Sequence, residues 1–203
     1  MQMKIFADKR YLPERLPHCQ MLFPFWGFTS KLARLTGLRF QVFDGYMERG
    51  AGLFAIAPLA EAEVAVLPFH WEQIVPQNLV SRCDVALYGE DMDVMRRTVT
   101  DALRRAEELA EEAAGAGKPL AVFFVDDSET ITVPLRGAYT FRPSLSAARR
   151  APREFAMPVW ISEDKVETSF GGRLPLRRKA ARPVVSFCGQ PGPRPSGVRS
   201  KLR

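Results

Sequence analysis

The feature that most constrains the fold of this chain is a helix set between two apolar runs. Residues 62–71 read AEVAVLPFHW and predict a strand at residues 64–69. Alanine, leucine, glutamate and arginine dominate residues 99–116, which predict a helix, and a second apolar run follows it at residues 120–125. Runs of this length are typical of strands that are buried on both faces. A strand, a helix and a strand at this spacing predict the right-handed crossover of a parallel sheet.

Other segments extend this α/β interpretation. The expected helix has one apolar stripe, formed by Leu103, Ala106, Leu109, Ala110 and Ala113. Strands or extended segments are predicted at residues 3–7, 38–43, 131–134, 138–142 and 155–161, and a short helix at residues 28–35. Pro158 argues against a central position for the last of these strands. Asp44 and Gly45 predict a turn, and residues 72–95 show no clean period.

Composition places the chain among ordinary globular proteins. Of its 203 residues, 46% are hydrophobic and 26% are charged. No apolar stretch approaches the ~20 residues of a membrane span, and the N-terminus lacks an apolar signal-peptide centre. The three cysteines lie far apart, which fits neither a disulfide framework nor a metal-binding spacing. We therefore expect reduced thiols, a cytoplasmic location and no metal.

The net charge of +6 is concentrated at the C-terminal end. Nine lysines and arginines lie from Arg173 onward, and no acidic residue follows Glu167. Residues 1–172 therefore hold 20 basic and 23 acidic groups, a net charge of −3. A basic tail can bind phosphates or nucleic acid, but the aromatic residues of a single-strand binder are missing after Phe187. A solvated linker is the simpler interpretation, and a nucleic-acid partner is not expected.

Polar side chains follow the predicted strands where they end. His70 and Trp71 follow one core strand, Asp126 and Asp127 follow the next, and Asp8 follows the first. The carboxyl ends of parallel strands meet at one edge of a sheet, where ligands bind in α/β folds. The sequence therefore predicts a crevice at this edge.

Each of these residues has a chemical role and a structural alternative. Asp126 or Asp127 can act as a general base or hold a hydroxyl group, but Asp-Asp-Ser is also turn chemistry. His70 can act as a base or orient a substrate hydroxyl, or it can cap or pack. Trp71 can stack on a sugar ring or fill the core. Asp8 can line the crevice or cap a turn.

Two more candidates lie in the segment YTFRPSL. Arg142 and Ser144 can bind an anionic or polyhydroxylated group, and Arg142 can equally pair with a nearby acid. The chain contains no Walker-type phosphate loop, no G-x-G-x-x-G fingerprint, no zinc spacing and no G-x-S-x-G elbow. A nucleotide cofactor or donor would therefore bind outside these residues.

Several segments together resemble the exostosin family of glycosyltransferases, in particular its bacterial exostosin-like proteins. They cover about two thirds of the chain in the order of the family. These segments are KIFADKRYLP, AEVAVLPFHW, AGKPLAVFFVDDSETI, YTFRPSL, REFAMPVW and RPVVSFCG. Residues 72–95 depart from the family pattern.

The resemblance implies a Rossmann-like parallel sheet with flanking helices, the N-terminal half of a GT-B type glycosyltransferase. Residues 1–172 would form the acceptor-side domain, and residues 173–203 a basic linker and the first strand of a truncated second domain. The missing half would bind the nucleotide-sugar donor, so the chain alone would be inactive. The acceptor would be a glycan or another hydroxyl compound. The alternative function is a non-catalytic carbohydrate-binding module.

Overall fold

The computed structural model describes residues 2–27, 44–75, 92–125, 131–143, 145, 148 and 150–157. The chain divides into two units, Met1–Asp164 and Lys165–Arg203, and all described residues belong to the first. The predicted helix at residues 28–35, the predicted strand at residues 38–43 and the whole segment from residue 158 onward lie outside the described residues.

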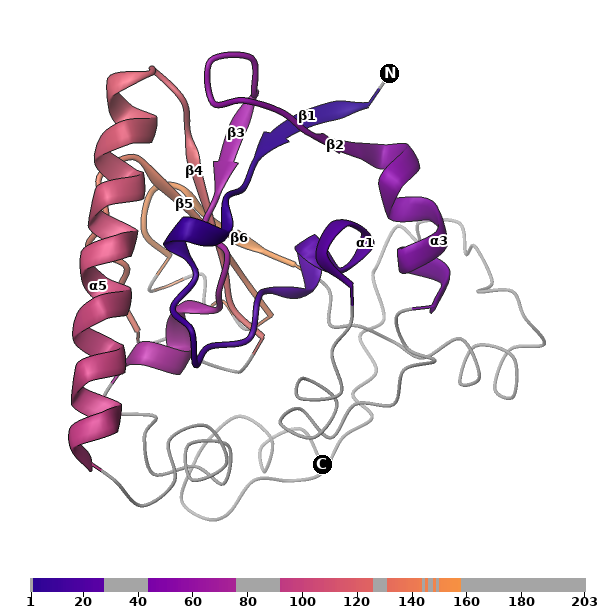
Figure 1. Ribbon diagram of the computed structural model, residues 1–203. Helices are drawn as coiled ribbons and strands as arrows, with labels where there is room; N and C mark the ends of the chain where they lie inside the picture. The colour runs from indigo at the N-terminus through magenta and orange to yellow at the C-terminus, as the bar shows by residue number, and fades with distance from the viewer. Residues whose placement is uncertain are drawn as a thin grey trace, which may run out of the picture. The chain divides into compact units, whose positions relative to one another are not determined.

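A six-stranded, entirely parallel sheet forms the centre of the fold, and helices flank it (Figure 1). The strand, helix and strand pattern predicts this parallel sheet, and the arrangement is the Rossmann-like α/β fold that the resemblance implies. The strand order is β2-β1-β3-β4-β5-β6. The strands are β1 (Met3–Phe6), β2 (Phe54–Ile56), β3 (Val64–Val66), β4 (Leu120–Phe123), β5 (Ala138–Arg142) and β6 (Glu154–Ala156).

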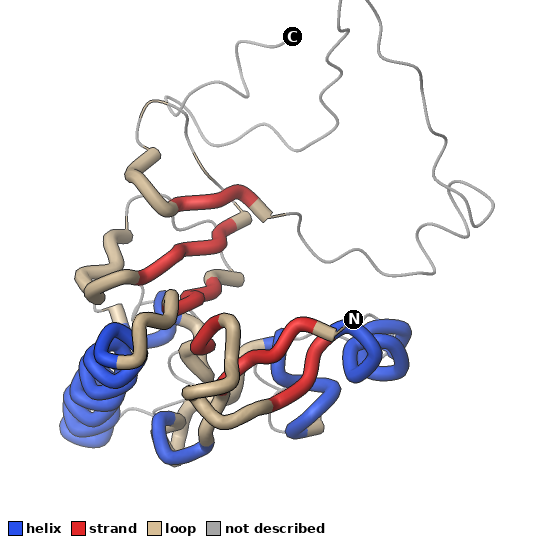
Figure 2. The backbone as a smooth tube through the Cα atoms, turned by 90° about the horizontal axis from the view of Figure 1, so that it is seen from above, coloured by secondary structure: helices blue, strands red, loops and turns tan. Residues whose placement is uncertain are grey.

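The helices include three short 3₁₀ turns. The α-helices are α1 (Phe23–Trp26), α3 (Asp44–Leu53) and α5 (Met92–Gly115), and the 3₁₀ helices are η1 (Lys9–Tyr11), η2 (Gln20–Leu22) and η4 (Trp71–Ile74). Figure 2 shows α5 beside one face of the sheet, and α1 and α3 near its β1 and β2 end. Within the described residues, no helix is both long enough and apolar enough to cross a membrane.

Helix α5 covers one face of the sheet with a stripe of small and branched side chains. Ala102, Ala106 and Leu109 are fully buried against Leu120 and Val122 of β4. The predicted stripe included Leu103, which is wrong, since this side chain is 37% exposed. Ala102 belongs to the stripe in place of Leu103, because it lies four residues before Ala106 and positions four apart share a helix face.

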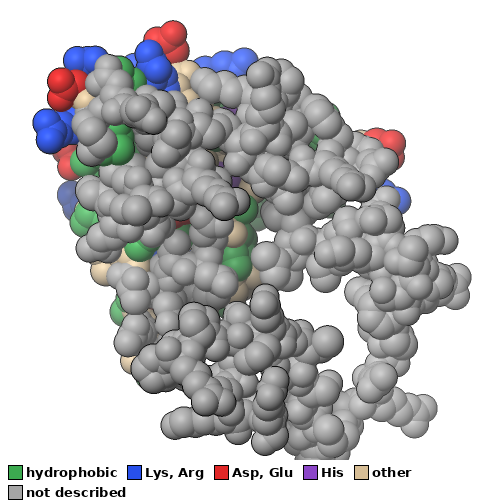
Figure 3. All heavy atoms as spheres, turned by 90° about the horizontal axis from the view of Figure 1, so that it is seen from below, with side chains coloured by type: hydrophobic (Ala, Val, Ile, Leu, Met, Phe, Trp, Pro, Cys, Tyr) green, Lys and Arg blue, Asp and Glu red, His purple; other side chains and the backbone are tan. Residues whose placement is uncertain are grey.

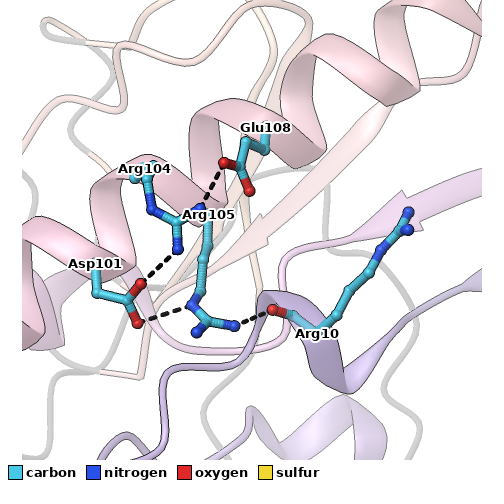
Figure 4. A network of polar contacts seen from close by, with 5 residues as sticks. All are labelled: Arg10, Asp101, Arg104, Arg105 and Glu108. Atoms are coloured by element: carbon cyan, nitrogen blue, oxygen red, sulfur yellow. Dashed lines mark hydrogen bonds and ion pairs between the residues drawn. The ribbon is translucent and has the colours of Figure 1, made fainter.

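Polar contacts join α5 to the segment that follows β1 (Figure 4). Asp101 accepts hydrogen bonds from Arg104 at 2.6 Å and from Arg105 at 2.8 Å, and Arg105 also donates to the carbonyl of Arg10. Arg104 continues the network to Glu108 at 2.5 Å. The contacts among Asp101, Arg104 and Glu108 lie within α5, so it is the bond from Arg105 to Arg10 that ties η1 to the helix in this network.

The opposite face of the sheet is covered near β1 by η2 and α1, which α3 supports in turn. Gly50 of α3 lies so close to α1 that a Cβ atom would come within 2.3 Å of Pro24 Cγ. The turn predicted at Asp44 and Gly45 is wrong, because α3 begins there. An Asp-Gly pair suits a turn, but packing against α1 stabilises a helix of low intrinsic propensity.

Candidate functional site

The strand order reverses at β1. Both β2 and β3 pair with β1, one on each side, so the chain leaves β1 toward one edge of the sheet and later builds toward the other. Ligands in open α/β sheets bind beyond the carboxyl ends of the strands at such a switch point. The candidate site therefore lies where the segments after β1 and β3 meet.

Both histidines of the chain lie on these two segments. His18 follows β1, His70 follows β3, and each is at least nine-tenths buried. The backbone N–H of Cys19 donates to the carbonyl of Pro68 at 2.8 Å, which joins the two segments directly. Figure 3 views the molecule from the side toward which the strands point.

The imidazole of His70 has one engaged and one unengaged nitrogen. Its Nδ1 lies 3.3 Å from the carbonyl oxygen of Phe123, at the end of β4. A carbonyl only accepts, so Nδ1 carries the proton and Nε2 presents a lone pair. Among the described residues, Nε2 has no hydrogen-bond partner although it is buried. A buried acceptor without a partner is rare in folded proteins, so this nitrogen is the strongest indication of a ligand contact.

Burial keeps His70 neutral. Desolvation is the main cause that lowers the pKa of His70 to about 4, and the nearby His18 lowers it further, whereas the bond to Phe123 opposes the shift. At neutral pH the ring is therefore an uncharged group that can accept a hydrogen bond from a hydroxyl.

His18 makes the second half of the pair. Its Nε2 lies 2.8 Å from the carbonyl oxygen of Gly27, and its ring packs edge-on against Phe23 and Trp26 at 5.5 and 5.6 Å between centroids. Desolvation lowers the pKa of His18, and the charge of Lys9 adds to this effect. Sequence reasoning missed His18, although the presence of only two histidines in the chain was a signal.

Glu72 connects η4 to the exit of β4. Its Oε1 accepts a hydrogen bond from the backbone N–H of Val125 at 2.7 Å, and the residue is 4% exposed. Together with the bond from His70 to Phe123, this contact holds the last residues before Asp126 beside the histidine. Asp126, Asp127 and Ser144 lie outside the described residues.

Cys19 is not suited to nucleophilic chemistry. Complete burial raises the pKa of its thiol to about 12, and the carboxylate of Glu72 adds to the effect. The thiol stays protonated and lies 3.7 Å from the carbonyl oxygen of Leu67. In the part of the chain that the structure describes, no group of three histidine, cysteine or acidic side chains is arranged to hold a metal ion.

The remaining predicted residues have intramolecular partners. Trp71 is 3% exposed, and its indole N–H donates to the carbonyl of Thr132 at 3.1 Å, so it has the packing role that the sequence left open. Asp8 caps η1 by accepting from the backbone N–H of Arg10 at 2.9 Å.

Arg142 is fully buried at the carboxyl end of β5. It pairs with Glu154 at 2.9 Å, donates to the carbonyl of Ile131 at 2.9 Å and lies over the ring of Phe124. This is the pairing with an acid that the sequence offered as the alternative to ligand binding. The guanidinium joins β5 to β6 and to the loop before β5.

The geometry thus brings together His70, His18 and Glu72 at the switch point. Trp71, Asp8 and Arg142 instead have structural roles, in packing, capping and ion pairing.

No protein-family model matches this chain, and neither a curated protein nor a solved structure is significantly similar to it.

Proposed function

We propose that this chain is the acceptor-side half of a GT-B type glycosyltransferase, which transfers a sugar from a nucleotide-sugar to a hydroxyl group of a glycan or a similar acceptor. One observation carries the proposal. The neutral imidazole of His70 lies at the switch point of a parallel sheet, and its buried Nε2 has no partner among the described residues. The ordered segments that resemble exostosin-like enzymes supply the reaction class.

In this proposal His70 orients the acceptor. A hydroxyl of the acceptor donates its hydrogen bond to Nε2, which fixes the oxygen for attack on the anomeric carbon of the donor. A histidine with a pKa of about 4 is a weak base, because an effective general base has a pKa near the working pH. We therefore assign His70 a positioning role rather than proton removal.

Asp126 and Asp127 remain the candidates for the base. They follow Val125, whose N–H is bound by Glu72, and Phe123, whose carbonyl is bound by His70. Val125, the last described residue before them, is therefore held beside the segment of His70 and Glu72. A carboxylate there would accept the hydroxyl proton as the glycosidic bond forms and the nucleoside diphosphate leaves from the donor.

The test is transfer activity of the natural gene product that contains this chain. The protein is incubated with a panel of labelled nucleotide-sugars and hydroxyl acceptors, and transfer and donor hydrolysis are both measured. We expect His70→Gln to lower kcat/KM by about 10²-fold, because a misplaced acceptor costs about that much. Lys4→Gln, at the opposite end of β1, is the control and should retain full activity.

Two results would overturn the proposal. Absence of transfer and of donor hydrolysis with every nucleotide-sugar would remove the catalytic assignment. Glycan binding without either reaction would favour the carbohydrate-binding module.

A further inference from the structure

A row of aromatic side chains crosses β4, β5 and β6 on the face of the sheet opposite α5. Phe123, Phe141 and Phe155 are register partners on neighbouring strands. Their rings stack with centroids 5.1 and 5.5 Å apart, and Tyr139 stacks on Phe155 at 6.1 Å. The row ends on β6, at the edge of the sheet, where Phe155 is 38% exposed.

The described helices on this side of the sheet lie elsewhere. Helices α1 and α3 pack near β1 and β2, as Figure 2 shows, and neither of them lies over β5 or β6. An exposed phenylalanine at the end of a stacked aromatic row is therefore part of the surface of the described fold.

Two arginines flank this row. Arg150 lies over the ring of Phe155 at 5.7 Å, and Arg153 lies over the ring of Tyr139 at 5.4 Å. Both are exposed, as is Arg136 in the turn before β5. Among the described residues, neither Arg150 nor Arg153 forms an ion pair. The neighbouring carboxylate of Glu154 is paired with Arg142 instead.

The backbone of Arg153 gives an independent observation. Its φ of 68° lies in the left-handed region, where glycine is favoured and a side chain is strained. The chain nevertheless places an arginine there, and the conformation holds the guanidinium over Tyr139. Residues held in strained conformations are enriched at binding sites, because function retains what stability alone would not.

The chemistry of this surface selects its ligand. The ring faces are occupied by other rings or by guanidinium groups, so they do not offer a platform for stacking a sugar or a base. The surface instead offers guanidinium N–H groups, which suit phosphate oxygens, next to one exposed apolar side chain. Cations beside an exposed aromatic group match the interface of an anionic bilayer.

We propose that the arginine–aromatic surface of Tyr139, Arg150, Arg153 and Phe155 docks onto anionic phospholipid membranes. This surface lies on β5, on β6 and on the residues just before β6, whereas His18 and His70 follow β1 and β3, which β4 separates from β5 in the strand order. The proposal does not depend on the transferase assignment.

The test is sedimentation of the full chain with phospholipid vesicles. Vesicles of phosphatidylcholine and phosphatidylserine in equal amounts are compared with vesicles of phosphatidylcholine alone. We expect Arg150→Gln/Arg153→Gln to weaken binding to the anionic vesicles about 25-fold, since each arginine near the surface contributes about fivefold. The control Arg49→Gln/Arg97→Gln removes the same charge from exposed positions on α3 and α5 and should change little. Residues 173–203 are present in every variant, so their basic charge contributes equally to every measured affinity and cancels in the comparison.

A second variant separates binding from folding. Arg153→Gly relieves the left-handed strain, so its thermal midpoint should equal or exceed that of the wild type, while vesicle binding falls about fivefold. Equal binding by the wild type and the double variant would overturn the proposal. It would also fail if the double variant lost affinity for dextran sulfate or single-stranded DNA but kept its affinity for vesicles.

Discussion

The burial of His70 makes a quantitative prediction about stability and pH. The pKa of this imidazole is about 4 in the folded protein and about 6.5 in an unfolded chain, so the unfolded state binds a proton first as the pH falls. The stabilisation is complete above pH 6.5 and is lost progressively as the pH falls from 6.5 toward 4. The difference corresponds to about 3 kcal/mol of unfolding free energy.

The assay is urea unfolding, followed by tryptophan fluorescence and circular dichroism, at a series of pH values across this range. His70→Gln removes the titrating group, so the wild type should lose about 3 kcal/mol more than the variant between neutral pH and pH 4. The carboxylates titrate in both proteins and cancel in the comparison. His18→Gln/His70→Gln serves as the control, because it removes every histidine and leaves only the loss that the carboxylates cause.

Parallel pH profiles for the wild type and His70→Gln would refute this reasoning, since they would mean that His70 titrates equally in both states. Should His70→Gln fail to fold, the pKa of His70 in the wild type can be read directly by NMR, because only two imidazoles are present. A value near 6.5 would refute it equally.

Two further predictions concern packing and buried charge. Gly50→Ala should destabilise the protein by about 1–3 kcal/mol in urea unfolding, because the new Cβ meets Pro24 at 2.3 Å. Gly52→Ala in the same helix meets nothing within 4 Å and should stabilise it by about 0.5–1 kcal/mol, and equal effects would contradict the packing of α1 on α3. Glu154→Gln should cost about 3 kcal/mol in thermal or urea unfolding, because it leaves the fully buried Arg142 without its carboxylate. A loss below 1 kcal/mol, as expected for the exposed pairs of α5, would show that Arg142 does not depend on this carboxylate.

Local pattern was sufficient to predict the central part of the sheet. The apolar runs at residues 64–69 and 120–125 and the helix between them appear as β3, β4 and α5, and the parallel pairing of β3 with β4 follows. The helix begins at Met92, earlier than predicted. The sequence does not reveal its first turns as helical, because arginine and aspartate stand among their apolar residues. The stripe through Met95 and Ala102 becomes evident only once the helix packs on the sheet.

The candidate site was harder to predict, because its members meet through tertiary contacts. His18 lies in an irregular segment, and contacts of the neighbouring Cys19 with Pro68 and Leu67 bring it to the segment of His70. The partner of the Trp71 indole is Thr132, 61 residues away in the sequence. Amphipathic side chains of this kind suit both a core and a binding surface, so the sequence alone left both open.

The most direct test of the central claim is an imidazole ¹⁵N NMR spectrum of the histidine-labelled chain at neutral pH, recorded without and with the acceptor identified in the transfer assay. We expect His70 to be neutral with its proton on Nδ1, and its Nε2 resonance to shift when the acceptor is added. A charged ring, a proton on Nε2, or an Nε2 resonance that the acceptor leaves unchanged would refute the role of His70 in orienting the acceptor.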